Sequence, residues 1–78
     1  YFGPKNFEVG KKYRIRSIKY KKEKEIGYRE GIVTRNDVIQ NNGARALEMI
    51  VEERWRRSRR NVRRMYSYYK MVEAWELN

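Results

Sequence analysis

The chain has 78 residues, of which 40% are hydrophobic, and its 20 Lys and Arg residues against 10 Asp and Glu give it a net charge of +10. A chain of this length is expected to form one domain, residues 1–78, of modest stability, because a small fold leaves much of its surface exposed. It contains no cysteine and no histidine, which excludes disulfides, thiolate nucleophiles, zinc knuckles and His-dependent catalytic triads.

From the same composition we expect no cofactor, no metal site and an intracellular protein. No apolar run approaches the roughly 20 residues that span a bilayer, so we expect no membrane contact. The first ten residues, with the turn signal Gly3-Pro4, are interpreted as a segment that leads into the first strand.

Residues 11–34 are predicted to form a β-hairpin. In the first half, Tyr and Ile alternate with Lys and Arg, which is typical of a strand, and a bulge near Ser17 would bring its apolar side chains to one face. A charged connection over residues 22–27 ends in glycine and suits a hairpin loop. In the second strand, Gly31 would allow another backbone segment to approach closely.

Residues 36–57 are predicted to form a helix. Thr34 or Asn36, followed by Asp37, suits a helix N-terminus. Apolar residues then recur at spacings of three and four, as on one helical stripe: Val38, Ile39, Ala46, Leu47, Ile50, Val51 and Trp55. The Asn-Asn-Gly sequence at 41–43 interrupts this pattern and leaves open a helix that begins only after residue 43.

Residues 62–77 are predicted to form the final strand. Their parity would bury Met65, Tyr69 and Met71 and expose Arg64, Tyr66, Tyr68 and Lys70. Helical spacing within the same segment leaves a helix as the alternative. We favour the strand because the tyrosine-rich sequence prefers β structure, and a continuous helix from residue 44 to 78 would be far longer than average.

Together these elements predict a small α+β domain of order ββαβ, with an antiparallel three-stranded sheet covered on one face by the helix. The last strand would lie beside the first, antiparallel to it, so that both basic regions share the free sheet face. The alternative is an SH3-like all-β barrel, in which residues 44–56 and 62–77 form a second hairpin around the basic turn.

The positive charge is concentrated in two regions. Residues 54–70 contain seven arginines and one lysine without any acid, residues 11–24 sum to +7, and the remaining residues sum to −5. Arginine can hold a phosphate with two hydrogen bonds, and tyrosine can stack on a nucleic-acid base. The sequence therefore predicts a non-enzymatic domain that binds RNA or DNA, with a lean towards RNA or single strands.

The predicted binding residues comprise an arginine-rich corner between helix and final strand, the adjoining sheet face and the basic side chains of the first strand. They are Arg54, Arg56, Arg57, Arg59, Arg60, Arg63, Arg64, Tyr66, Tyr68, Lys70, Lys12, Arg14, Arg16 and Lys19. No catalytic constellation stands out, because the nearest group of acids, Glu23, Glu25 and Glu30, is embedded among lysines.

A second hypothesis is a protein-interaction module or regulator that docks on an acidic surface of a larger machine that handles nucleic acid. Trp55 and Trp75 lie near arginines in a composition typical of interface hot spots. Their environment separates the hypotheses: a tryptophan under the sheet belongs to the core, and one exposed beside arginines suits an anchor.

Overall fold

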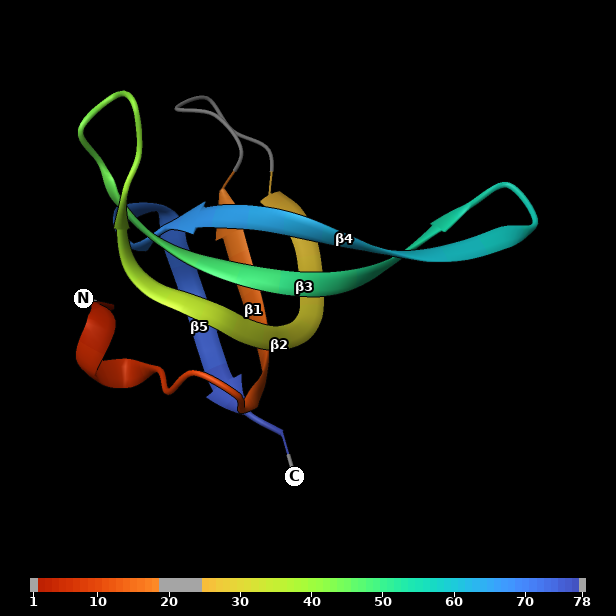
Figure 1. Ribbon diagram of the computed structural model, residues 1–78, viewed down its shortest axis with the longest axis horizontal. Coiled ribbons are helices and arrows are strands. Elements are labelled where there is room, and N and C mark those ends of the chain that lie inside the picture. Colours follow the sequence, from red (N-terminus) through yellow and green to blue (C-terminus); the bar gives the residue numbers. More distant parts are fainter. Residues whose placement is uncertain (1, 19–24, 78) are drawn as a thin grey trace.

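A computed structural model of the chain describes residues 2–18 and 25–77, and these residues form an all-β fold (Figure 1). The strands are β1 (Lys12–Ile18), β2 (Glu25–Ile39), β3 (Arg45–Trp55), β4 (Ser58–Ser67) and β5 (Met71–Glu76). Short 3₁₀ turns, η1 (Pro4–Asn6) and η2 (Tyr68–Lys70), precede β1 and β5. The part of the chain that the structure describes contains no α-helix.

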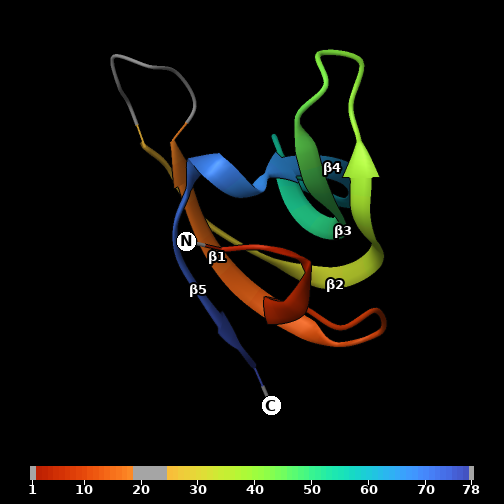
Figure 2. The same cartoon turned by 90° about the vertical axis from the view of Figure 1, so that its left-hand side faces the viewer.

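The strands form one sheet in the order β4-β3-β2-β1-β5, and every neighbouring pair is antiparallel. Consecutive strands are therefore neighbours, except that β5 returns to pair with β1. Long β2 curves strongly, so that β1 and β5 form one layer and β3 and β4 another (Figures 1 and 2). The α+β prediction is wrong, and the all-β alternative fits better, although the last strand does lie antiparallel beside the first.

The hydrophobic core lies between these two layers. The residues with at most 1% of their surface exposed come from β1, β2 and β3, and the largest of them are Ile15, Leu47, Met49, Val33 and Val51. Aromatic rings from the N-terminal segment, β1, β4 and η2 close the core, namely Phe7, Tyr13, Tyr66 and Tyr68. Burial of this apolar surface is the main favourable term available to a chain of this size.

Gly31 marks the point where β2 passes from one layer to the other. It pairs with Tyr13 of β1 and with Val51 of β3. A Cβ atom at this position would lie 2.3 Å from the carbonyl oxygen of Ile50 and 2.8 Å from Cγ1 of Val51. Only glycine allows the two backbones to approach this closely, so the close approach predicted for Gly31 is confirmed.

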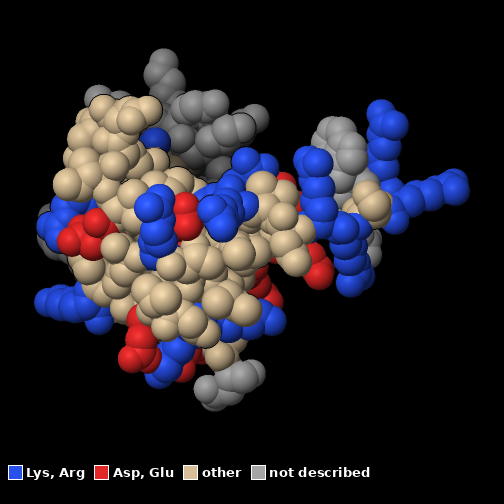
Figure 3. Space-filling model, viewed as in Figure 1, with Lys and Arg blue, Asp and Glu red and all other residues tan. Residues whose placement is uncertain are grey.

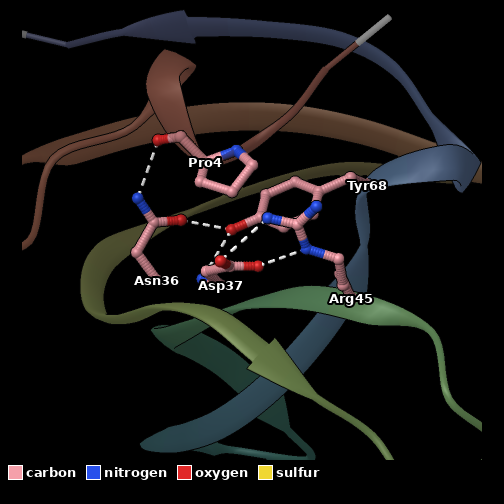
Figure 4. Close-up of polar contacts among 5 residues, drawn as sticks. All are labelled: Pro4, Asn36, Asp37, Arg45 and Tyr68. Carbon is pink, nitrogen blue, oxygen red and sulfur yellow. Dashed lines mark hydrogen bonds and ion pairs between the residues drawn. The ribbon is translucent and has the colours of Figure 1, made fainter.

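Polar contacts surround Asn36 and Asp37, at the irregularity of β2 beyond Gly31 (Figure 4). Asn36 donates to the carbonyl of Pro4 at 2.7 Å, and the hydroxyl of Tyr68 donates to Asn36 Oδ1. The backbone N–H of Asp37 donates to the Tyr68 hydroxyl at 2.8 Å, while Arg45 holds the Asp37 carboxylate with two bonds of 2.5 and 2.8 Å. These contacts join the N-terminal segment, β2, β3 and η2.

The predicted helix over 36–57 is wrong, because this segment is the end of β2, a tight turn and β3. Asp37, expected to start the helix, lies at an irregularity of β2 with φ 58°. Asn-Gly at 42–43 forms the turn, where the N–H of Gly43 donates to Gln40 and φ is 86°. In β3, residues 46–49 are all buried, so the alternation of a strand disappears and the remaining spacing resembles that of a helix.

The predicted single strand over 62–77 is instead two strands joined by η2, and its predicted parity is wrong for the three tyrosines. Tyr66 and Tyr68 are buried, whereas Tyr69 is 68% exposed. Tyr66 lies opposite Leu47 in the register of β3 and β4, which turns its ring into the core. The error does not extend to Arg64, which is exposed, or to Met71, which is 8% exposed, as predicted.

The first hairpin also differs in detail from its prediction. A register shift lies between Ser17 and Ile18, close to where the bulge was predicted, and Ser17 is buried. Ile18 is 37% exposed, so the bulge does not bring it to the core face. Of the predicted loop at residues 22–27, residues 25–27 instead belong to β2, and residues 22–24 fall outside the described residues.

Candidate nucleic-acid interface

The hairpin of β3 and β4 is longer than the sheet that supports it. β3 pairs with β2 as far as Gly31 and Val51, whereas its pairing with β4 continues to Trp55 and Ser58. Residues 52–61 therefore form a two-stranded ribbon, with no strand beside β3 in the part of the chain that the structure describes. In Figure 1 this ribbon projects from the right-hand side of the molecule. We refer to residues 52–61 as the arginine ribbon.

The tip of the arginine ribbon is a two-residue turn made of Arg56 and Arg57. Arg56 has φ 55°, a left-handed conformation that glycine adopts more easily and that costs another residue on the order of 1 kcal/mol. Residues 54–60 hold five arginines and no acid. The concentration of like charge at a strained turn is not what stability alone would select.

Positive charge extends along both faces of the arginine ribbon. Arg59 lies opposite Arg54 in the register, and Arg60 lies opposite Glu53. Consecutive residues of a strand point to opposite faces, so Arg59 and Arg60 lie on different sides. The space-filling view shows Lys and Arg side chains leaving the projecting end in several directions (Figure 3).

Acidic residues neutralise the base of the ribbon but not its tip. Arg64 donates to both carboxylate oxygens of Glu53 at 2.9 Å, and this bond lowers the pKa of Glu53 below its ordinary value. Arg59 lies 3.7 Å from Glu52, and both side chains are more than 60% exposed. By contrast, Arg57 and Arg60 of the ribbon form no hydrogen bond or ion pair with the described residues, and neither does Arg63, which lies opposite Ile50 just beyond the ribbon. Those three cations are available to an external anion.

The basic residues of β1 lie elsewhere. In the sheet, β2 and β3 separate β1 from β4, so the predicted alignment of the two basic regions on one face is not found. Arg14 is paired with Glu30 at 2.6 Å and Arg16 with Glu73 at 3.0 Å, so acidic residues within the fold neutralise both charges. Lys12 is exposed, and Lys19 falls outside the described residues.

The predicted stacking surface of Tyr66, Tyr68 and Lys70 is not available on an open face. Both tyrosine rings are 6% exposed, and burial is the main reason that the pKa of each hydroxyl is raised. The Lys70 amine lies 5.7 Å from the ring of Tyr69 instead, and the Lys70 carbonyl accepts a bond from Ser17. The sequence-predicted site is thus divided among the ribbon, the core and the opposite layer.

An exposed aromatic cluster on β1, β2 and β5 was only partly anticipated. The rings of Tyr28 and Trp75 meet edge to face with centroids 5.8 Å apart, and the Arg14 guanidinium lies 5.6 Å from the Trp75 ring. Tyr28 is 52% and Trp75 39% exposed. Trp75 was singled out in the sequence, whereas Tyr28 was not among the predicted binding residues. We call Arg14, Tyr28 and Trp75 the aromatic cluster.

A groove of about 790 Å³ connects the ribbon with the opposite layer. Its lining combines apolar side chains of β2 and β3 with charged and polar side chains from both layers, namely Lys12, Tyr28, Arg29, Glu30, Gly31, Ile32, Ile50, Glu52, Glu53 and Asn61. The charges of this lining are of both signs, so it does not form a second anion site. Lys12 and the ribbon residues Glu52, Glu53 and Asn61 line the same groove.

The described residues contain no cluster of acids that could hold a metal ion, and no helix among them is long and apolar enough to cross a membrane. No protein-family model, curated protein or solved structure matches the chain. The arguments about function therefore depend on the geometry and charge described above.

Proposed function

We propose that this chain is a non-enzymatic domain that binds nucleic acid through its phosphates, with the arginine ribbon as the clamp. The observation that carries the proposal is that Arg57 and Arg60 are exposed and form no hydrogen bond or ion pair with the described residues, within a segment, residues 54–60, that holds five arginines and no acid. Arginine is weakly hydrated and holds phosphate with two parallel hydrogen bonds.

A purely protective role for these charges accounts for less of the geometry. Charged side chains on an outer strand prevent edge-to-edge aggregation, and β4 is an outer strand of this sheet. That role needs charges along the edge of β4 and not at the turn. It gives no reason for an arginine at position 56, where φ is 55° and glycine is less strained.

The salt dependence of binding tests this proposal. If about six phosphates are contacted, the logarithm of the binding constant should fall with the logarithm of the salt concentration with a slope of roughly −4 to −5. Fluorescence anisotropy with a labelled oligonucleotide measures this slope. A flat response to salt would contradict the proposal.

A pair of matched variants assigns the binding to the ribbon. Arg57→Ala with Arg60→Ala removes two ribbon charges, whereas Lys5→Ala with Lys11→Ala removes the same charge from the N-terminal segment. We expect the first variant to weaken binding by about tenfold or more and to reduce the magnitude of the salt slope by about two, because two phosphate contacts are lost. Equal losses in both variants would mean that only net charge matters.

The second candidate function is a module that docks on an acidic protein surface, and the environment of Trp75 favours it. Trp75 is exposed, lies beside Arg14 and meets Tyr28, which is the arrangement expected of an anchor and not of a core tryptophan. Burial of Tyr66 and Tyr68 also removes the stacking face that the nucleic-acid hypothesis included.

Binding to a polyanion without phosphate distinguishes the two candidates. Poly-glutamate presents carboxylates alone, whereas single- and double-stranded oligonucleotides present phosphates at a comparable charge. Nucleic-acid binding predicts a clear preference for the oligonucleotides and little effect of Trp75→Ala. Preference for poly-glutamate, lost in Trp75→Ala and retained in Arg57→Ala, would favour protein docking.

A further inference from the structure

We propose that the arginine ribbon enters the major groove of double-stranded DNA, tip first. This inference rests on the proposed nucleic-acid function and adds to it the form of nucleic acid that is bound. It depends on three properties of the molecule. They are the directions in which the charges of the ribbon point, the size of the ribbon, and the positions of the aromatic rings on which a single strand would stack.

The first property is the distribution of charge over three sides. Arg57 lies in the turn, and Arg59 and Arg60 leave β4 on opposite faces. A single strand offers one phosphate backbone, which one charged face can follow. A duplex groove offers a phosphate backbone on each wall and base edges on its floor. Charge on both faces and at the tip matches a groove with two walls.

The second property is the size of the ribbon. Its two strands lie about 4.8 Å apart, and from Val51 to the turn it extends over five residues, which corresponds to about 17 Å. The major groove of B-form DNA is about 12 Å wide and 8.5 Å deep, and it admits a two-stranded β-ribbon. The ribbon is therefore narrow enough to enter and long enough for its tip to reach the base edges.

The placement of the acids suits the same orientation. Glu52 and Glu53 lie at the base of the ribbon, where they would come nearest the phosphates at the mouth of the groove. Their carboxylates are already directed to Arg59 and Arg64, respectively, which reduces their repulsion of phosphate. From Arg54 to the turn and back to Arg60, the inserted part contains no acid.

The third property concerns the alternatives to duplex DNA. Single-strand binders stack bases on exposed aromatic rings within a basic groove, yet Tyr66 and Tyr68 are buried in the hydrophobic core. The exposed rings of Tyr28 and Trp75 contact each other and Arg14, in the opposite layer. Double-stranded RNA has a deep, narrow major groove that protein side chains cannot read.

Binding to matched nucleic acids tests the inference. The probes are a labelled DNA duplex of about two helical turns, its single strand and the RNA duplex of the same sequence, each titrated at two salt concentrations. We expect the DNA duplex to bind about tenfold more tightly than either alternative. Equal or tighter binding of the single strand or the RNA duplex would overturn the inference while leaving the nucleic-acid function intact. Absence of binding to all three would overturn both.

Groove-specific blocking then identifies the side of the duplex that is occupied. A duplex whose cytosines carry glucosylated hydroxymethyl groups is obstructed in the major groove, and distamycin occupies the minor groove. We expect the first to weaken binding by about tenfold or more and the second to leave it unchanged. Competition by distamycin alone would overturn the inference. The Arg57→Ala, Arg60→Ala variant should lose the preference for the duplex, while the Lys5→Ala, Lys11→Ala control should retain it.

Discussion

The arginine ribbon and the body of the sheet are built from the same two strands but follow different physical rules. Up to Val51, β3 is a central strand in which most residues are buried, and four of them, Ala46, Leu47, Met49 and Val51, are completely inaccessible. Beyond Val51 the hairpin continues without β2, and its side chains from residue 56 to 61 are all exposed. The body therefore provides the stability of the fold, and the ribbon provides exposed positive charge. Mutations in the body should change stability, whereas mutations in the ribbon should change binding.

The largest difference between the ribbon and the body is expected in the free energy of unfolding, when one residue of each region is substituted in the same hairpin. Leu47→Ala removes a fully buried side chain and should lower the free energy of unfolding by about 2–5 kcal/mol. Arg57→Ala lies at the exposed turn and should change it by less than about 0.5 kcal/mol. Urea denaturation measures both. A comparable loss in Arg57→Ala would mean that the ribbon contributes to the fold.

The next largest change in stability is expected at Gly31, where β2 turns away from β3 and the ribbon begins. Gly31→Ala places a Cβ atom 2.3 Å from the Ile50 carbonyl oxygen, which neither backbone can relieve without shifting. We expect a loss of about 2–3 kcal/mol by thermal or chemical denaturation. Gly3→Ala is the control, because its Cβ would meet no atom within 4 Å. If Gly31→Ala were as stable as the control, the close approach at the bend would be absent.

A smaller change in stability, of opposite sign, is expected from a substitution at the turn of the ribbon. Arg56→Gly relieves the positive φ and should leave stability unchanged or raise it by up to about 1 kcal/mol, since the greater freedom of glycine in the unfolded chain offsets part of the gain. Affinity for nucleic acid should fall in the same variant. Denaturation and anisotropy on one sample measure the two quantities. A loss of stability without a loss of affinity would make Arg56 a structural residue.

The smallest effect concerns two carboxylates, one in each region. A hydrogen bond from Arg64 lowers the pKa of Glu53 at the ribbon base, and a hydrogen bond from Arg45 lowers the pKa of Asp37 in the body. Because both are lowered, each pair stabilises the native state above the ordinary carboxyl pKa, and this contribution disappears as the pH falls through the lowered value.

Carboxyl titration by NMR checks whether the two pairs are independent. Arg64→Gln should return the pKa of Glu53 towards its ordinary value and leave that of Asp37 unchanged, and Arg45→Gln should do the reverse. If either variant moved both pKa values, the ribbon and the body would be electrostatically coupled.

The sequence predicted local strand patterns better than it predicted the partners of each strand. The alternation around Tyr13 and Ile15 predicted β1 because that strand has one buried face, and Gly31 predicted the close approach because only glycine suits it. β3 was assigned to a helix because both of its faces are buried over residues 46–49. Its Asn-Gly turn was a hairpin signal that was interpreted as a helix interruption.

For the candidate site, the sequence could identify the arginines but not the shape that presents them. Charge density alone singled out residues 54–64, and the structure places them along one hairpin. Parity placed Tyr66 and Tyr68 on an open face, although burial of Tyr66 depends on its register with Leu47 and Tyr68 lies in the turn η2, neither of which a local pattern encodes. The length of the ribbon depends on where β2 turns away, a relation between residues 20 apart at Gly31 and Val51.

The order of strands in the sheet also bears on how the chain reaches this structure. Pairings between β1 and β2, β2 and β3, and β3 and β4 each join neighbours in the chain, whereas β5 must find β1 across a separation such as the 57 residues between Arg16 and Glu73. Closing so long a loop costs more chain entropy than forming a hairpin, and it is repaid only when the contacts are complete. We therefore expect the arginine-bearing hairpin to assemble early and the return of β5 to complete folding.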